Sequence, residues 1–295
     1  MKILITGGSG LLGQYLNEIL SNNYDILSLY NTNPGNCKNF FSKSVDLTEF
    51  KSVDELFESF KPNVVVHTAA VSNPKLAGKL PPAKVYEINV KATGHLAKLC
   101  ASYNCKLIYL STDLVYDGSE GGNLKENSKL NPVSLYAETK LMGELKISGL
   151  FDNYLILRTA LMYGIGLNSS KNHFTEVFEK LSKREPVKLF YDQFRSPLAL
   201  HDAARMISGL IPLGIKGEII NFGGGERMSR FDLISELCKS AGFNQSLLIP
   251  VSMNDVNINY KVKDVSMNIE KLRSYGIAPM NIEDSIREVL KPHIN

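Results

Sequence analysis

The sequence predicts an α/β protein with a doubly wound parallel sheet and a smaller, interleaved C-terminal lobe. Through the first 160 residues, short β-branched runs alternate with amphipathic segments, which is the pattern of a parallel sheet covered by helices. The apolar runs are almost continuous, as expected for strands buried on both faces. After about residue 160 the alternation weakens, which indicates a second, smaller lobe.

The N-terminal part predicts strands over 2–6, 24–30, 63–69 and 106–112. Between them, Thr48 is expected to cap a helix over 49–60, and Pro81 and Pro82 are expected to open a longer helix that ends near Tyr103. The polar segment 113–133 contains several glycine and proline residues and is interpreted as a surface loop. A loop of that length in a compact domain usually has a function.

The C-terminal part begins after the apolar run over 153–164. Helices are predicted near 172–183, 201–211 and 229–241, with an isolated strand over 217–222. We therefore expect one domain over 1–160 and a lobe over 161–295, some segments of which return to the first sheet.

Composition excludes several classes of protein. The chain has 295 residues, 44% of them hydrophobic, and 33 basic against 30 acidic residues, so it is expected to be globular and not to bind nucleic acid. No apolar run approaches the ~18 residues of a membrane span, and no export signal is visible, so a cytoplasmic protein without membrane contact is expected. No CxxC pair occurs, and we expect inert, reduced thiols at Cys37, Cys100, Cys105 and Cys238.

Two kinds of catalytic site find no support in the sequence. The five histidines lack the spacing of metal ligands, so no metal is expected. A Gly-x-Ser-x-Gly elbow is absent, and no serine–histidine–acid arrangement is visible, so hydrolase chemistry is not indicated.

A glycine-rich turn follows the first predicted strand directly. Gly7 permits a tight turn, Gly10 lets the backbone approach a pyrophosphate, and Gly13 allows close packing of helix on strand. The helix that follows opens with Leu11 and Leu12, and its N–H groups point toward bound phosphates. A strand, this turn and a helix in succession predict dinucleotide binding.

A phenol and an amine lie one helical turn apart, at Tyr136 and Lys140. They open the helix after the long loop, and Thr112 ends a buried strand at the edge where open α/β sheets bind ligands. Reduction of a ketone needs a proton for the carbonyl oxygen, and a nearby ammonium is expected to lower the pKa of the phenol from ~10. The alternative is ordinary packing of an aromatic ring against a lysine stem.

The Gly-x-x-Gly-x-x-Gly spacing and the Thr112, Tyr136 and Lys140 set resemble the extended short-chain dehydrogenase/reductases. The resemblance implies an NAD(P)-binding Rossmann domain over 1–160 and a mostly substrate-binding lobe over 161–295. It also implies that Lys140 binds the nicotinamide ribose and Tyr136 lies beside it, while Thr112 orients the substrate carbonyl. Further cofactor contacts are implied after the second strand, in the loop that follows it and after the next strand, at Asn31, Asp46, Leu47, Ala70, Val71 and Ser72.

The cofactor preference stays open between NADPH and NADH. No acidic residue stands at 30–32 to hold a ribose 2′-hydroxyl, and no arginine stands there to hold a 2′-phosphate. For Asp46 the alternative role is a simple loop cap.

The resemblance narrows over the later stretches STDLVYDG, NPVSLYAETKLMGE, LILRTALMYG, NHF, DQFRSP and VKDVSMNIEKL, which are similar to the dTDP-4-dehydrorhamnose reductases. It implies reduction of a nucleotide-linked 4-keto-6-deoxy sugar, with Thr112, Asp113, Tyr136, Leu161 and Arg195 near the substrate. Two positions depart from that family: Leu161 replaces a tryptophan and Arg195 is gained, either as a diphosphate clamp or as a structural ion pair.

Two alternatives to the reductase remain. One is a sugar-nucleotide epimerase that keeps its cofactor bound. The other is a non-catalytic subunit, because the resemblance extends to the regulatory β subunit of methionine adenosyltransferase. The expected partner is a sugar nucleotide, and a homodimer is possible.

Overall fold

The computed structural model of the chain describes residues 1–168, 170, 172–257 and 261–293. Its centre is a seven-stranded sheet in the order β11-β6-β5-β4-β1-β2-β3, and every neighbouring pair is parallel. The strands are β1 (Lys2–Thr6), β2 (Asp25–Tyr30), β3 (Ser42–Ser44), β4 (Val64–His67), β5 (Lys106–Thr112), β6 (Tyr154–Thr159) and β11 (Glu218–Phe222). The strand order reverses between β1 and β4, where sheets of this kind bind ligands. The predicted fold class is confirmed.

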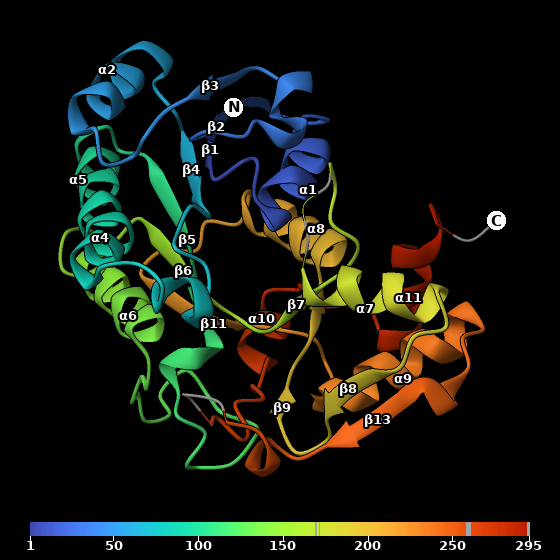
Figure 1. Cartoon of the computed structure of the whole chain (residues 1–295). Helices are drawn as coiled ribbons and strands as arrows, with labels where there is room; N and C mark the ends of the chain where they lie inside the picture. Colours follow the sequence, from blue (N-terminus) through green and yellow to red (C-terminus); the bar gives the residue numbers. More distant parts are fainter. Residues whose placement is uncertain (169, 171, 258–260, 294–295) are drawn as a thin grey trace.

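Helices cover both faces of the sheet (Figure 1). On one face lie α1 (Leu11–Leu20) and α8 (Leu200–Leu210), and on the other lie α2 (Phe50–Phe60), α5 (Thr93–Ser102) and α6 (Leu135–Ser148). Alternate strand residues serve the two cores: Ile3 and Ile5 pack toward α1 and α8, and Leu4 packs toward α2 and α5. Burial on both faces explains why the strand sequences are almost continuously apolar.

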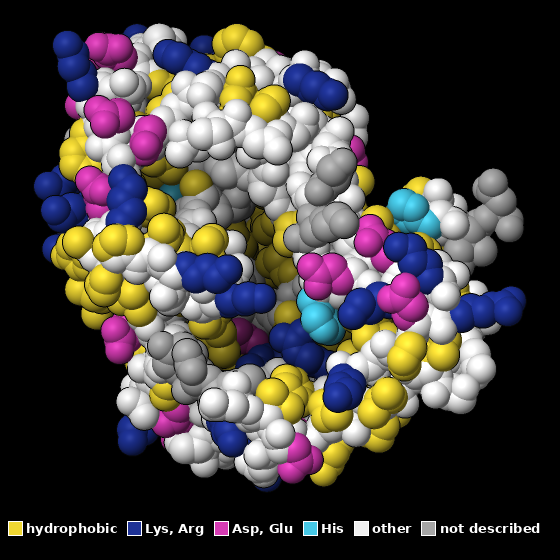
Figure 2. All heavy atoms as spheres, in the orientation of Figure 1, with side chains coloured by type: hydrophobic (Ala, Val, Ile, Leu, Met, Phe, Trp, Pro, Cys, Tyr) yellow, Lys and Arg dark blue, Asp and Glu magenta, His cyan; other side chains and the backbone are white. Residues whose placement is uncertain are grey.

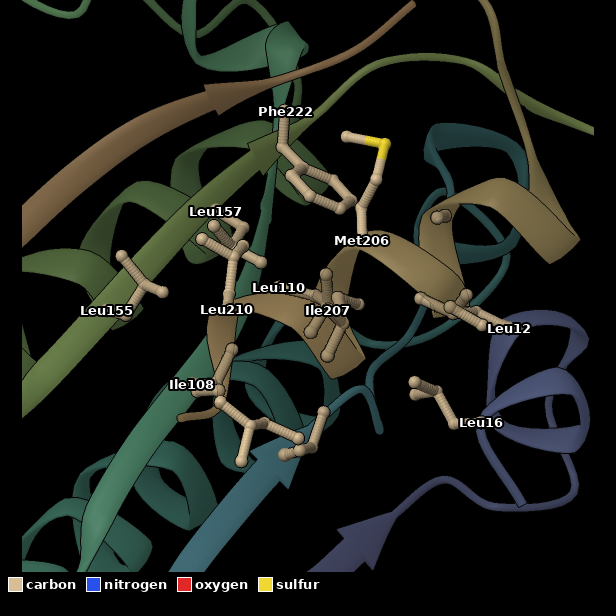
Figure 3. Close-up of a cluster of buried hydrophobic side chains, with 14 of the residues drawn as sticks. Leu12, Leu16, Ile108, Leu110, Leu155, Leu157, Met206, Ile207, Leu210 and Phe222 are labelled. Atoms are coloured by element: carbon tan, nitrogen blue, oxygen red, sulfur yellow. The ribbon is translucent and has the colours of Figure 1, made fainter. Parts of the chain in front are cut away.

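The strand over 217–222 is not isolated, contrary to the expectation. It is β11, which extends the main sheet by pairing with β6, so that Ile220 lies opposite Leu157. Helix α8 also belongs to the large lobe, where it packs beside α1. Figure 3 shows Leu16 of α1, Ile207 and Leu210 of α8 and Phe222 of β11 within this core. Segments from both halves of the chain therefore build the large lobe.

The small lobe has a core of its own. It contains α7 (His173–Ser182), β8 (Val187–Phe190), α9 (Arg230–Ala241), β13 (Leu248–Val251) and α11 (Ile282–Leu290). Short strand pairs connect it to the sheet, and α10 packs against β11. These connecting elements are β7 (Met162–Tyr163), β9 (Phe194–Arg195), β10 (Leu198–Ala199), β12 (Met228–Ser229) and α10 (Glu270–Ser274).

Two local predictions are wrong. Thr48 does not cap α2, because its hydroxyl donates to Asp46 Oδ1 at 2.7 Å and the N-cap position is Glu49. The segment 113–133 is not wholly a surface loop, because Val115, Tyr116 and Leu124 are buried against the C-terminal chain around Val265. Their apolar side chains anchor the loop over the carboxyl end of β5.

The helix expected to begin at Pro81 and Pro82 is present, but its middle is a π-helical turn, which is wider than an α-helical turn. It runs as α4 (Pro82–Tyr86), a π-helical turn (Glu87–Ala92) and α5. Such turns often occur at functional sites. Within the described residues no helix is long and apolar enough to cross a bilayer, and the four cysteines are buried and free.

Candidate active site

The glycine turn joins β1 to α1, and three of its glycines serve it for different reasons. Gly7 has a φ of +69°, and a Cβ on Gly13 would lie 2.1 Å from Gly7 O. A Cβ on Gly10 would meet only Gly7 O, at 3.1 Å, and Gly10 is exposed. Because Gly10 is also the N-cap of α1 and has no side chain, the N–H groups of Leu11, Leu12 and Gly13 carry no side-chain cap. This cradle fits a pyrophosphate.

The residues expected near the adenosine lie beyond β2. Asn31 is exposed directly after β2, and its carbonyl accepts from Ser44 Oγ. Asp46 Oδ1 accepts from both the N–H and the hydroxyl of Thr48, and these bonds hold the pKa of Asp46 below its usual value. Asp46 therefore has the loop-cap role that was the structural alternative. Leu47 packs at the edge of the core between α2 and the sheet.

The chain after β4 is held by a buried asparagine that sequence reasoning missed. Asn89, in the π-helical turn, accepts from Val71 N at 2.8 Å and donates to Val71 O at 3.3 Å. Its amide also donates to Thr139 of α6 at 3.0 Å. Ala70 and Ser72, on either side of Val71, stay at least partly accessible. One side chain therefore fixes the predicted cofactor stretch against the helix that carries Tyr136.

Thr112, Tyr136 and Lys140 are all at most 9% exposed, and the last two lie one turn apart on α6. Thr112 ends β5, and its Oγ1 accepts from Leu114 N at 3.2 Å, which turns the chain outward. Tyr136 enters from the first turn of α6, which Ser134 caps through Ala137 N. The Thr112 hydroxyl lies close enough to the Tyr136 phenol to affect its pKa, and it donates to Asp113 Oδ1 at 3.2 Å.

The expected shift of the Tyr136 pKa is wrong in sign. Burial raises the pKa of Tyr136 to about 12, and the negative charge of Asp113 adds to this, while the hydrogen bond with Thr112 opposes it. Lys140 Nζ lies 4.0 Å from the centroid of the Tyr109 ring. Desolvation there lowers the pKa of Lys140 to about 7, against the opposing charge of Glu144. The phenol is therefore protonated at neutral pH and the amine is only partly charged.

Beside Thr112, Asp113 is buried in an unusual way. Its Oδ2 makes no hydrogen bond within the described part of the chain, although Arg195 Nε lies 3.5 Å away. Burial raises the pKa of Asp113, and it lowers the pKa of Arg195. Arg195 forms an ion pair and also lines a cavity, so its position is compatible with both expected roles, the structural ion pair and the diphosphate clamp.

That cavity has a volume of about 600 Å³ and lies between the two lobes, in the hollow that Figure 2 shows. Leu114 and Ser134 line it, each two residues from a predicted catalytic residue. Arg195 and Arg230 form its small-lobe wall. Two guanidinium groups therefore line one cleft, and the buried Asp113 carboxyl lies 3.5 Å from one of them, which is typical of functional sites.

Sequence reasoning missed Arg230, although a signal was present. Arg230 is the first residue of α9 and lies between the capping-box residues Ser229 and Asp232, where the helix dipole disfavours a cation. Its Nε donates to Gln193 Oε1 at 3.1 Å, and burial lowers its pKa to about 10. A cation in that place suggests a role other than stability.

Leu161 lies apart from Arg195, in a second cavity of about 160 Å³. This cavity is mostly apolar and includes Phe174 and Leu233, with Arg230 at its boundary with the larger one. The two predicted substrate positions are therefore in adjoining spaces, with Arg230 between them.

A buried polar network supports the site from below. Glu144 of α6 accepts from Arg158 of β6, with Nη2 to Oε2 at 2.8 Å, and from Ser111 Oγ of β5. Arg158 also donates to Tyr116 of the loop at 2.9 Å. The network ties three elements to α6 one turn beyond Lys140.

Comparisons with known proteins agree with this arrangement. The sequence matches the family described as RmlD substrate binding domain over residues 1–294. It is 30% identical over 225 residues to a dTDP-4-dehydrorhamnose reductase of Aggregatibacter actinomycetemcomitans, covering 75% of this chain and 71% of that relative. It is 28% identical over 303 residues to methionine adenosyltransferase 2 subunit beta of Xenopus laevis, covering 99% and 88%.

Solved structures extend the likeness. A dTDP-4-dehydrorhamnose reductase of Clostridium acetobutylicum superposes with a TM-score of 0.84 at 25% identity, covering 99% of both chains. The Bacillus anthracis reductase, solved with NADP, gives 0.85 at 24% identity over 98% of both chains, a likeness of fold alone. Because the family match spans residues 1–294 and a reductase relative reaches 30% identity, this chain belongs to the RmlD substrate binding domain family, among proteins like the extended short-chain dehydrogenase/reductases.

Proposed function

We propose that this protein uses NADPH or NADH to reduce a keto group of a nucleotide-linked sugar, as a dTDP-4-dehydrorhamnose reductase-like enzyme. One observation carries the proposal: Thr112, Tyr136 and the unsatisfied Asp113 are buried close to residues that line a cleft, and the guanidinium groups of Arg195 and Arg230 line the same cleft. The cleft thus offers a proton donor, a hydroxyl acceptor and an anion site in one place.

The cofactor residues support a nicotinamide dinucleotide. The cradle at Gly7, Gly10 and Gly13 receives the pyrophosphate, and the chain at Ala70–Ser72 lies along the path from that turn to Tyr136. Lys140 is the proposed partner of the nicotinamide ribose. When bound, the reduced cofactor supplies the hydride, and the protein supplies position and the proton.

The proposed proton donor is the Tyr136 hydroxyl. With a pKa of about 12 the phenol keeps its proton at neutral pH, so it is available for the carbonyl oxygen of the sugar. Thr112 lies beside this phenol and is proposed to hold the carbonyl in line. Charge that develops on the phenol oxygen is stabilised when Lys140 carries a proton, which bound phosphates favour.

Asp113 and the arginines are proposed to orient the substrate. Oδ2 of Asp113 can accept from a hydroxyl of the sugar, which gives this buried oxygen a hydrogen bond. Arg195 and Arg230 can donate to the diphosphate, and a guanidinium suits phosphate geometry. The replacement of a family tryptophan by Leu161 indicates that the sugar or base differs from that of the reductases.

Single-turnover oxidation of bound NADPH by 4-keto-6-deoxy sugars linked to dTDP or UDP tests this function. Stoichiometric oxidation with release of a reduced sugar supports a reductase. Conversion without net cofactor consumption indicates an epimerase instead.

A regulatory subunit is the second candidate, because the methionine adenosyltransferase β subunit matches over 99% of the chain. Absence of turnover, together with stable co-purification of a methionine adenosyltransferase catalytic subunit, favours this candidate. Retention of Thr112, Tyr136 and Lys140 in one buried cluster favours catalysis.

A further inference from the structure

The wall of the 600 Å³ cavity that belongs to the large lobe also carries positive charge. Lys75 and Lys79 line it, opposite Arg195 and Arg230 of the small lobe. None of the described residues that line the cavity is acidic. Figure 2 shows Lys and Arg side chains around and inside the hollow between the lobes.

The two lysines project from a short, well-anchored segment after β4. Asn73 Oδ1 accepts from Leu76 N at 2.8 Å and caps the short helix α3 (Pro74–Ala77). Ala77 is 1% exposed and packs in the same apolar cluster as Tyr136. Lys75 lies in α3 and Lys79 in the turn that follows it, and both line the cleft together with Pro74 and Gly78.

Both lysines are free to bind a ligand. Their side chains are exposed, and neither forms an ion pair with another described residue. By contrast, Arg195 is already partly neutralised by Asp113. The uncompensated charge of the cleft therefore resides mainly in Arg230 and in these two lysines.

We propose that Lys75 and Lys79 are further substrate-binding residues, which hold the diphosphate of the sugar nucleotide from the wall opposite Arg195 and Arg230. This assignment rests on the proposed function, because it takes a nucleoside diphosphate as the ligand. A diphosphate carries two negative charges, one for each wall, so a ligand held between the walls draws the two lobes together. A monophosphate reaches fewer of these cations.

The segment that carries Lys75 and Lys79 also packs near Tyr136. Ala77 and Tyr136 belong to one apolar cluster, so the segment that carries the lysines is anchored close to the proposed proton donor. Lys75 and Lys79 act here as binding residues, and their loss is expected in KM far more than in kcat.

The test compares the double variant K75Q/K79Q with a control, K98Q/K188Q. The control removes the same charge from exposed lysines on the outer surfaces of α5 and β8, away from the cleft. Calorimetric titration with dTDP, UDP and dTMP gives the affinities, at low and moderate salt. An NADPH titration of each variant checks the cofactor site.

For K75Q/K79Q the affinity for the nucleoside diphosphates is expected to fall ~2- to 25-fold, since exposed ion pairs contribute ~0.2–1 kcal/mol each. The loss for dTMP is expected to be smaller, and the loss for dTDP and UDP is expected to shrink as salt rises. NADPH affinity should stay within about twofold of the control. An unchanged diphosphate affinity, or a loss equal to that of the control, overturns the assignment.

The outcomes separate this inference from the proposed function. A protein that binds dTDP or UDP through the two lysines but reduces no sugar nucleotide keeps the binding assignment and loses the reductase. A protein that reduces a sugar nucleotide with an unchanged KM in K75Q/K79Q keeps the reductase and loses the assignment. If neither diphosphate binds the wild-type protein, the assignment is wrong.

Discussion

The amine of Lys140 lies over the ring of Tyr109, with Nζ 4.0 Å from the ring centroid, and both side chains are almost completely buried. The ring face offers some stabilisation to a cation, but less than water does. The pKa of Lys140 consequently falls to about 7. At neutral pH the folded protein therefore holds a partly neutral amine at Lys140, where the proposed mechanism uses a charged one.

From this relationship we expect Lys140→Met to stabilise the fold while damaging function. Between pH 7 and ~10.4 the unfolded chain binds a proton at Lys140 that the folded chain does not, so the stability of the wild type rises with pH in that window. The advantage of the variant should be largest at pH 7 and below, and it should shrink toward pH 10. At ~1.4 kcal/mol per pKa unit, the difference reaches a few kcal/mol.

Urea unfolding of both proteins at pH 6.5, 8 and 9.5 measures this effect, and NADPH titration in the same buffers measures the cofactor affinity, which is expected to fall in the variant. A stability difference that is constant across pH contradicts the assigned origin of the shift. An unchanged NADPH affinity contradicts the ribose contact.

Breaking the ion pair between Glu144 and Arg158 is expected to be costly. Glu144→Gln leaves the Arg158 guanidinium buried without its counter-charge, and such losses amount to ~3–5 kcal/mol. The matched control is Glu218→Gln, which breaks the half-exposed pair with Lys271 and should cost under ~1 kcal/mol. Equilibrium unfolding gives the free energy of unfolding of both variants. Equal losses would mean that the buried ion pair stabilises the fold no more than the half-exposed one.

The glycine turn predicts two different kinds of failure. In Gly10→Val the new side chain projects where a pyrophosphate would approach, so NADPH affinity should collapse while the unfolding transition changes little. In Gly13→Ala the Cβ would meet Gly7 O at 2.1 Å, so stability itself should fall. Thermal unfolding and NADPH titration of each variant distinguish the two, and full affinity in a folded Gly10→Val protein would make the turn purely structural.

Local sequence patterns predict much of this molecule because they report local physics. The turn at Gly7, Gly10 and Gly13 follows from backbone sterics, and the buried strands follow from apolar runs. Tyr136 and Lys140 are brought together by helical spacing alone, and Thr112 joins them because parallel strands end at one edge.

The failures have physical causes that no local pattern contains. Thr48 does not cap α2 because its hydroxyl donates to Asp46, and the local sequence is compatible with either the cap or this hydrogen bond. The sign of the Tyr136 pKa shift depends on burial by segments from elsewhere in the chain. Arg230 lies 94 residues after Tyr136 in the sequence, and it reaches the cleft only because α9 packs in the small lobe.

The cofactor preference follows from what stands after β2. No described carboxylate lies at Tyr30–Thr32 to repel a 2′-phosphate, so NADPH is expected to bind at least as tightly as NADH. Calorimetric titration with both cofactors measures the ratio. A preference for NADH above about tenfold, or ~1.4 kcal/mol, would contradict the expectation.

The sharpest prediction concerns the proton. Tyr136→Phe keeps the buried ring and deletes only the hydroxyl, so the fold and the NADPH affinity should change little. Loss of a general acid typically costs ~10²–10⁴-fold in rate, and kcat for the sugar nucleotide should fall by that order without a matching rise in the dissociation constant for NADPH. Because a pKa of about 12 keeps the phenol protonated, the wild-type rate should not fall through loss of this proton between pH 6 and 9.

Tyr109→Phe is the matched control, because Tyr109 is also a buried tyrosine and its ring lies next to Lys140, while its hydroxyl donates to the backbone oxygen of Lys140. Single-turnover oxidation of bound NADPH by a 4-keto-6-deoxy sugar nucleotide should proceed in Tyr109→Phe at a rate near that of the wild type, and it should nearly stop in Tyr136→Phe. Reduction by Tyr136→Phe at the wild-type rate would show that another group delivers the proton, and the neighbouring Thr112 hydroxyl would be examined next by Thr112→Val.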